Sequence, residues 1–193
     1  MEPQRLRVTI ASARNGDGQA YQRLLEVYGP RLYGYFFRAT GSCHDAEDLL
    51  GELMLRMVRT LKAYDDRGRF DQWVFRIAAN MIRDRIRRRK TNPVPASLSA
   101  EDDSGNSMAE QLPGRSVRVD QNLLGAEVSL ELKDALAKLD DTTRHMVLLR
   151  HYGDLSFKEI ADLFQCPLGT VLARVHRGIK ALKKWMGAEH EPD

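Results

Sequence analysis

Basic side chains collect on one side of a predicted helix at residues 70–90. With about 100° of rotation per residue, one side of this helix is apolar, and the opposite side carries Trp73, Arg76, Asn80, Arg83 and Arg87. Guanidinium groups hold phosphates, and an exposed indole beside an amide can stack on bases or read them. This combination favours binding of nucleic acid. These residues alone also allow a solvated basic face that complements the helix dipole.

A second candidate site lies near the carboxyl end of the chain. Ser156 and Glu159 form a capping-box pattern before the apolar run that ends at Phe164. A second helix then begins near Pro167, which we expect in its first turn. Two short helices joined by a tight turn, with a basic second helix, predict a helix-turn-helix. A plain helical hairpin is the alternative.

The exposed side of this last helix contains candidate contacts to DNA. We expect Leu168, Val171, Val175, Ile179 and Leu182 to be buried. The exposed set is Thr170, Leu172, Ala173, Arg174, His176, Arg177 and Lys180. In a major groove Arg177 can donate two hydrogen bonds to the edge of a guanine, while Arg174 or Lys180 can bind a phosphate.

A third surface comes from a helix predicted over residues 45–61, with Ser42 as its cap. Its apolar residues fall on one arc, and Asp48, Glu52 and Leu55 lie on the other. An exposed leucine among acidic residues suggests a partner surface, although a solvated face with one stray leucine explains the pattern equally well.

These surfaces require two helical modules. Sequence patterns typical of helices run from about residue 6 to residue 90. Breaks between helices are predicted at Asn15–Gly18, Gly29-Pro30, Thr40-Gly41 and 65–68. Residues 91–124 are polar and proline-containing, which predicts a flexible acidic linker. Helical patterning returns over residues 125–186, and residues 187–193 form a tail. We therefore predict an all-α fold of two small helical domains, 1–90 and 125–186, joined by a linker.

Charge and composition narrow the function classes. Residues 1–90 contain 18 Lys/Arg and 11 Asp/Glu, whereas residues 91–124 contain 2 and 5. A concentrated positive charge suits a polyanionic partner. No run of about eighteen apolar residues predicts a membrane span, and the first residues lack the apolar stretch of a secretory signal, so we expect a cytoplasmic protein without membrane insertion.

Signals for catalysis are missing. Cys43 and Cys166 lie far apart, and His44 lacks the additional ligands that a metal requires. Neither a glycine-rich phosphate loop nor a nucleophile elbow is present, and the pairs Asp65-Asp66 and Asp140-Asp141 sit at predicted turns. We expect no catalytic residue, metal or cofactor, and we do not expect an enzyme.

The ordered motifs resemble those of the extracytoplasmic-function (ECF) sigma factors, the bacterial promoter-specificity subunits of RNA polymerase. The resemblance covers nearly the whole chain. Its motifs are the Asn15–Gly18 turn, Asp45-Ala46-Glu47-Asp48-Leu49, Phe70 with Trp73, Arg76–Asn80, Leu155–Ala161, Cys166–Val171 and Arg174–Arg177. The chain departs from the pattern at Gly51, where glutamine is common, and at Leu172-Ala173, which replace a basic and hydroxyl pair.

The resemblance implies a role for each surface. Asp48, Glu52 and Leu55 would dock on the clamp helices of the largest polymerase subunit, and the second domain would meet the polymerase flap. The loop with Asp65, Arg67 and Arg69 would hold a base flipped from the minus-ten element. Trp73, Arg76, Asn80, Arg83 and Arg87 would lie at the upstream duplex edge. The exposed residues of the last helix, chiefly Leu172, Ala173, His176 and Arg177, would read the minus-thirty-five element.

The implied partners are core RNA polymerase, promoter DNA and an anti-sigma factor. The alternative function is a helix-turn-helix transcriptional regulator that does not require polymerase core. That alternative leaves unexplained the predicted outward Trp73 and the basic end of the predicted 70–90 helix, which consists of Arg85, Arg87, Arg88, Arg89 and Lys90. Such regulators also normally dimerise to span two half-sites.

Overall fold

The structure is a computed structural model, and it describes residues 2–66, 68–91 and 131–187. The helices of the first part are α1 (Pro3–Arg14), α2 (Gly18–Thr40), α3 (Cys43–Thr60), the short 3₁₀ turn η1 (Leu61–Ala63) and α4 (Phe70–Thr91). Residues 131–137 are also helical, followed by α6 (Asp141–Tyr152), α7 (Phe157–Phe164) and α8 (Leu168–Trp185). No strand occurs within these ranges, so the predicted all-α class is confirmed.

Local capping signals explain where several of these helices begin and end. The Asp17 carboxylate accepts hydrogen bonds from the amides of Gln19 and Ala20 at the start of α2. The Ser42 hydroxyl accepts from the amide of Asp45 at the start of α3, as its position before the apolar arc predicted. Gly41 ends α2 with φ of 75°, a conformation that glycine adopts without a Cβ clash.

The predicted break at Gly29-Pro30 is wrong, because α2 continues through Pro30. A proline inside a helix removes one backbone hydrogen bond. Tyr28 and Leu32 on either side of the proline are buried in the hydrophobic core, as are Leu24 and Tyr35 further along the same helix. This packing retains the helix across the proline.

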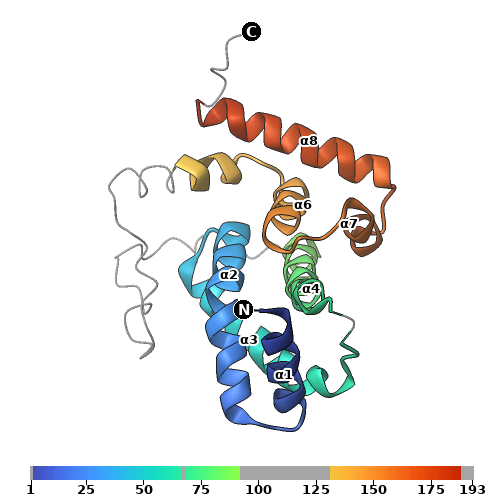
Figure 1. Ribbon diagram of the computed structural model, residues 1–193. Coiled ribbons are helices and arrows are strands. Elements are labelled where there is room, and N and C mark those ends of the chain that lie inside the picture. The colour runs from blue at the N-terminus through green and yellow to red at the C-terminus, as the bar shows by residue number, and fades with distance from the viewer. Residues whose placement is uncertain (1, 67, 92–130, 188–193) are drawn as a thin grey trace.

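One hydrophobic core joins the helices on both sides of residues 92–130. Figure 1 shows α6 between α8 on one side and the α2 and α4 helices on the other, and α6 contacts all three. Met146 and Leu149 of α6 belong to the same buried cluster as Phe36 of α2 and Phe75 of α4. The carboxyl-terminal helices are therefore packed against the amino-terminal module. Thr91, the first residue of the predicted linker, is the last residue of α4, and the rest of the predicted linker lies outside the described residues.

Candidate nucleic-acid interface

The outward side of α3 carries the predicted partner surface. Leu49, Leu53 and Met57 are buried on its inner side. On the outer side Asp48 and Glu52 are exposed, and 61% of Leu55 is exposed. Glu52 also pairs with Arg56 one turn away, at 2.6 Å. Val58, which sequence reasoning missed, is 46% exposed beside Leu55 and extends the apolar part of this surface; its three-residue spacing from Leu55 was the available signal.

The segment before α4 forms a turn supported by a buried aromatic side chain. The amide of Gly68 donates to the Asp66 carboxylate at 3.0 Å. Asp65 and Arg69 are exposed, and Arg67 lies outside the described residues. Tyr64 is buried behind the turn, and burial together with the charge of Asp66 raises the pKa of its phenol to about 12.

The exposure of Trp73 differs from the sequence prediction, because its ring is half-buried and does not project freely from α4. Its centroid lies 4.7 Å from that of Tyr64 and 5.4 Å from that of Phe70. Trp73 sits in the first turn of α4, where these two rings extend the core underneath it. Only part of the indole is therefore available for stacking on a base.

The basic residues of α4 do not share one environment. Arg76 and Arg87 are exposed, whereas Asn80 and Arg83 are half-buried. Arg87 lies 3.4 Å from Asp84. Arg83 donates a hydrogen bond to the carbonyl oxygen of Leu163 in α7. The predicted outward position of Arg83 is wrong, because α7 packs over this part of the helix.

The first helix of the helix-turn-helix is fixed by the predicted capping box. The Ser156 hydroxyl accepts from the Glu159 amide, and the Glu159 carboxylate accepts from the Ser156 amide at 2.9 Å. Gln165 then adopts a left-handed conformation with φ of 52°, which ends α7 and turns the chain into α8. Pro167 is the cap residue of α8 rather than a member of its first turn, because the helix begins at Leu168.

Helix α8 presents most of the predicted contact residues to solvent. The exposed members are Thr170, Leu172, Ala173, His176, Arg177 and Lys180. Val171, Val175 and Leu182 are buried as predicted, but Leu168 and Ile179 are 45% and 41% exposed. The buried residue next to Ile179 is Gly178, where an added Cβ would lie 2.9 Å from Thr143 and 3.0 Å from Val147. The helices α6 and α8 thus cross closely at this glycine, and Ile179 falls outside the contact.

Arg174 is engaged within the protein instead of projecting freely. One of its guanidinium nitrogens donates to the Asp140 carboxylate and to the Thr143 hydroxyl, each at 3.0 Å. Asp140 is the cap of α6, where it accepts from the Thr143 amide. Burial alone would raise the pKa of Asp140, but the bonds from Thr143 and the charge of Arg174 outweigh it and lower this pKa. Arg174 therefore holds α8 against the start of α6.

Sequence reasoning missed the contacts that join the two modules. Arg31 of α2 pairs with Asp71 at 3.0 Å and with Asp154, beyond α6, at 2.9 Å. The Tyr35 hydroxyl and Nε2 of His145 share a buried hydrogen bond. The pairs Arg31–Asp154 and Tyr35–His145 join residues more than one hundred positions apart in sequence, so no local sequence pattern could predict them.

The described residues contain no cluster of three or more side chains suited to hold a metal ion. Among the same residues, no helix is long and apolar enough to cross a membrane.

Comparisons with known proteins agree with the two-module arrangement. The sigma-70 region 2 family matches residues 24–91, and the sigma-70 region 4 family matches residues 129–182. The ECF RNA polymerase sigma factor SigW of Bacillus subtilis is 30% identical over 91% of this chain and 93% of its own length. The ECF RNA polymerase sigma factor SigE of Mycolicibacterium smegmatis is 29% identical over 100% of this chain and 71% of its own length.

A solved structure has the same fold. The sigma factor RpoE of Bartonella quintana, in complex with the anti-sigma factor NepR, superposes with a TM-score of 0.63 at 18% identity. The superposition covers 88% of this chain and 98% of that one. This likeness shows the fold, and the matches to both sigma regions and to SigW show that the chain belongs to the ECF family of RNA polymerase sigma factors, which direct promoter-specific transcription initiation.

Proposed function

We propose that three surfaces of this sigma factor have separate binding roles in transcription initiation. The outer side of α3 docks on the clamp helices of core RNA polymerase, and the second module also meets the polymerase flap. The loop before α4 and the basic side of α4 engage the minus-ten element, and α8 reads the minus-thirty-five element. The protein acts in the cytoplasm, where promoter DNA and polymerase are found, and it performs no catalysis of its own.

The observation that carries the minus-thirty-five assignment is the division of α8 into two sides. Val171, Val175 and Gly178 are buried where α8 packs on α6 and α7, so these two helices fix the orientation of α8 without DNA. The opposite side presents Arg177 and His176 to solvent. Arg177 donates from Nε to the carbonyl of Ala173 at 3.2 Å, which leaves its terminal nitrogens available for a guanine edge.

The observation that supports polymerase docking is the exposed apolar pair Leu55 and Val58, which follows the exposed acidic residues Asp48 and Glu52 along the outer side of α3. A central apolar contact with a polar rim is the common composition of a protein interface. Acidic groups at the rim favour a basic partner and speed its association. The described residues leave this surface uncovered by the second module.

Transcription in a reconstituted system tests both assignments. Core polymerase is mixed with the protein and fragmented genomic DNA, and transcript ends are sequenced; the wild-type chain should produce starts that share two upstream elements. Arg177→Ala should weaken promoter affinity of the holoenzyme by roughly 1 to 3 kcal/mol. Arg5→Ala, which removes an exposed cation of α1, is the control and should bind normally.

The polymerase surface is tested by Leu55→Asp in a core-binding assay. This variant should lose about tenfold or more in affinity, because it places a carboxylate in an apolar contact. Val8→Asp makes the same change at a residue of α1 that is 64% exposed and should leave affinity unchanged. Equal affinities of the Leu55→Asp and Val8→Asp variants for core polymerase would refute the docking assignment. Unchanged initiation with Arg177→Ala would refute the proposed role of α8.

By analogy with RpoE and CnrH, whose structures are complexes with NepR and with the cytosolic domain of CnrY, we further propose that an anti-sigma factor binds this chain. Co-purification of a partner from the native host would test this.

A further inference from the structure

Two apolar side chains lie on the exposed side of α8, beside the residues proposed to read bases. Leu172 is 43% exposed, and Ala173 next to it is also exposed. Leu172 precedes His176 by four positions and Ala173 precedes Arg177 by four, so each pair occupies neighbouring turns on one side of the helix. Arg177 donates from Nε to the carbonyl of Ala173, which fixes the second pair. Both apolar side chains therefore face the same partner as His176 and Arg177.

Packing within the described residues does not account for Leu172. Val171 and Val175 are buried where α8 meets the core. Leu172 belongs neither to this buried cluster nor to the partly buried side chains that pack against it. Its apolar surface therefore remains available to a partner, and covering that surface would stabilise the complex.

The first half of α8 has little capacity for hydrogen bonding through its side chains. Residues 168–173 contain no charged side chain, and Thr170 supplies their only side-chain hydrogen-bonding group. In a helix-turn-helix these amino-terminal residues of the second helix meet the base edges of the major groove. The hydroxyl of Thr170 both donates and accepts, so it discriminates weakly among bases. An alkyl side chain instead contacts the C5 methyl group of thymine, so this half of α8 favours thymine.

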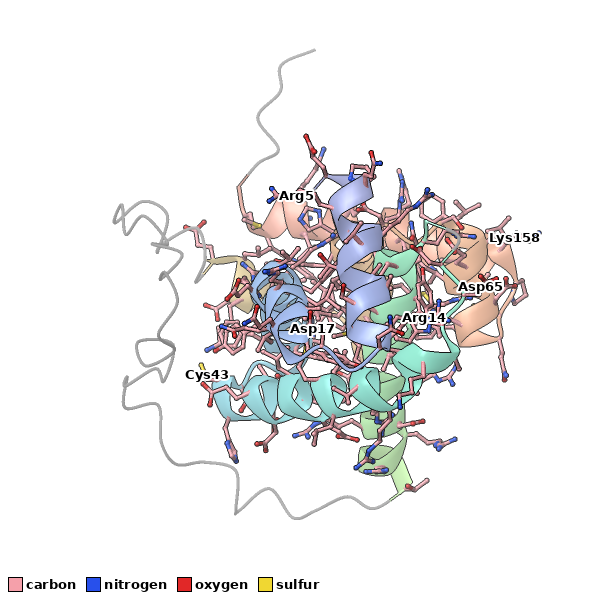
Figure 2. All side chains as sticks on the ribbon, turned by 60° about the horizontal axis from the view of Figure 1, so that its bottom comes forward. Arg5, Arg14, Asp17, Cys43, Asp65 and Lys158 are labelled. Carbon is pink, nitrogen blue, oxygen red and sulfur yellow. The ribbon has the colours of Figure 1, made fainter. Side chains whose placement is uncertain are left out.

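Basic side chains around Leu172 can hold it over a fixed base pair. Lys158, in the first turn of α7, is exposed. Figure 2 shows Lys158 at an edge of the molecule, with Cys43 of α3 on the opposite side. The first helix of a helix-turn-helix crosses the DNA backbone, so Lys158 is placed to bind a phosphate, and the exposed Lys180 of α8 can bind another. Phosphate contacts of this kind set the register of the protein on the duplex.

We infer that Leu172 is a specificity-determining residue that selects thymine in the minus-thirty-five element through contact with its C5 methyl group. This inference rests on the proposed role of α8 in reading that element. The short side chain of Ala173 allows α8 to approach the bases closely, and Arg177 one turn further along donates to a guanine edge. The element should therefore contain a thymine whose methyl group contributes to promoter affinity.

The test removes the methyl group from the DNA and the leucine from the protein, separately and together. The probe is a fluorescein-labelled promoter fragment taken from one of the starts found with the wild-type holoenzyme. Each thymine of its upstream element, on either strand, is replaced in turn by deoxyuridine, which pairs normally and lacks only the C5 methyl group. Affinity is measured for holoenzymes that contain the wild type, Leu172→Ala or Ile179→Ala. Ile179 is the matched control, because it is 41% exposed on the same helix but lies two turns beyond Leu172.

The wild-type holoenzyme should bind about three- to fivefold more weakly when one particular thymine is replaced, which is the change expected for one methyl group that leaves an apolar contact. Leu172→Ala should weaken binding to the natural promoter by a similar or larger factor. It should also bind the thymine and deoxyuridine fragments equally at that position. Ile179→Ala should retain the response to the methyl group.

The outcomes separate this inference from the proposed function. An upstream element without thymine, an affinity that no replacement changes, or a response that persists in Leu172→Ala overturns the selection of thymine by Leu172. A response that disappears equally in Ile179→Ala overturns it as well, because the loss then does not depend on Leu172. If Arg177→Ala weakens binding while no replacement does, α8 still reads the element and only the role of Leu172 fails. If neither Arg177→Ala nor any replacement changes the affinity, the proposed role of α8 itself fails.

Discussion

Acidification from about pH 7.5 to about pH 5.5 should destabilise the folded chain through one residue, His145. Its ring is buried between α6 and the neighbouring helices, where it meets the Tyr35 hydroxyl from α2, the ring of Phe164 from α7 and the charge of Arg83 from α4. Burial, and then the charge of Arg83, lower the pKa of His145 from 6.5 to about 3. Within the described residues its Nδ1 atom has no hydrogen-bond partner, so a second ring proton would find no acceptor.

The magnitude follows from linkage between protonation and unfolding. The unfolded chain takes up a proton at His145 as the pH falls below 6.5, while the folded chain does not until the pH approaches 3. Stability is therefore complete above about pH 7 and declines as the pH falls. At pH 5.5 the loss is about 1.4 kcal/mol, close to a factor of ten in the folding equilibrium. Asp140 and Glu159, whose pKa values are lowered from 3.8 and 4.5, stay ionised in this range.

Urea unfolding followed by far-ultraviolet circular dichroism measures this loss. The comparison is made between the wild type and His145→Gln at both pH values, because glutamine can accept from the Tyr35 hydroxyl but does not titrate. The pH-dependent loss should be about 1.4 kcal/mol larger in the wild type, and residues that titrate elsewhere cancel in the difference. An equal loss in both proteins would show that His145 is not buried in its neutral form and would contradict the packing of α6 on α2.

Two substitutions test the packing of the second module by the same unfolding assay. Arg144→Ala should lower the free energy of unfolding by about 2 to 4 kcal/mol, because this half-buried guanidinium donates to the carbonyls of Leu136 and Ala137 at the end of the 131–137 helix and to that of Leu139 just beyond it. An unchanged free energy of unfolding would show that those bonds contribute nothing. Gly178→Ala should cost about 1 to 3 kcal/mol through its clash with Thr143 and Val147. Gly51→Ala, at an open site in α3, should instead be neutral or stabilising, and similar losses for the two glycine variants would contradict the close crossing of α6 and α8.

The predictions that succeeded concern individual helices. The capping positions of Ser42 and Ser156 follow from neighbours within three residues, so the sequence pattern alone identifies them. The exposed position of Leu55 follows equally from helical spacing. The basic surface of α4 was only partly predicted. A helical wheel separates the polar side of α4 from its apolar side, but it cannot show that α7 covers part of the polar side.

Local sequence determined the helices, their polar and apolar sides and the motifs of the family, since each depends on residues that are close along the chain. Tertiary structure alone decided that Pro30 stays within a helix, that Gly178 and not Ile179 lies at the crossing of α6 and α8, and that His145 is buried against Tyr35. These features arise where separate helices compete for the same space. The physical reason is that burial and desolvation depend on the neighbours that folding brings from distant parts of the chain.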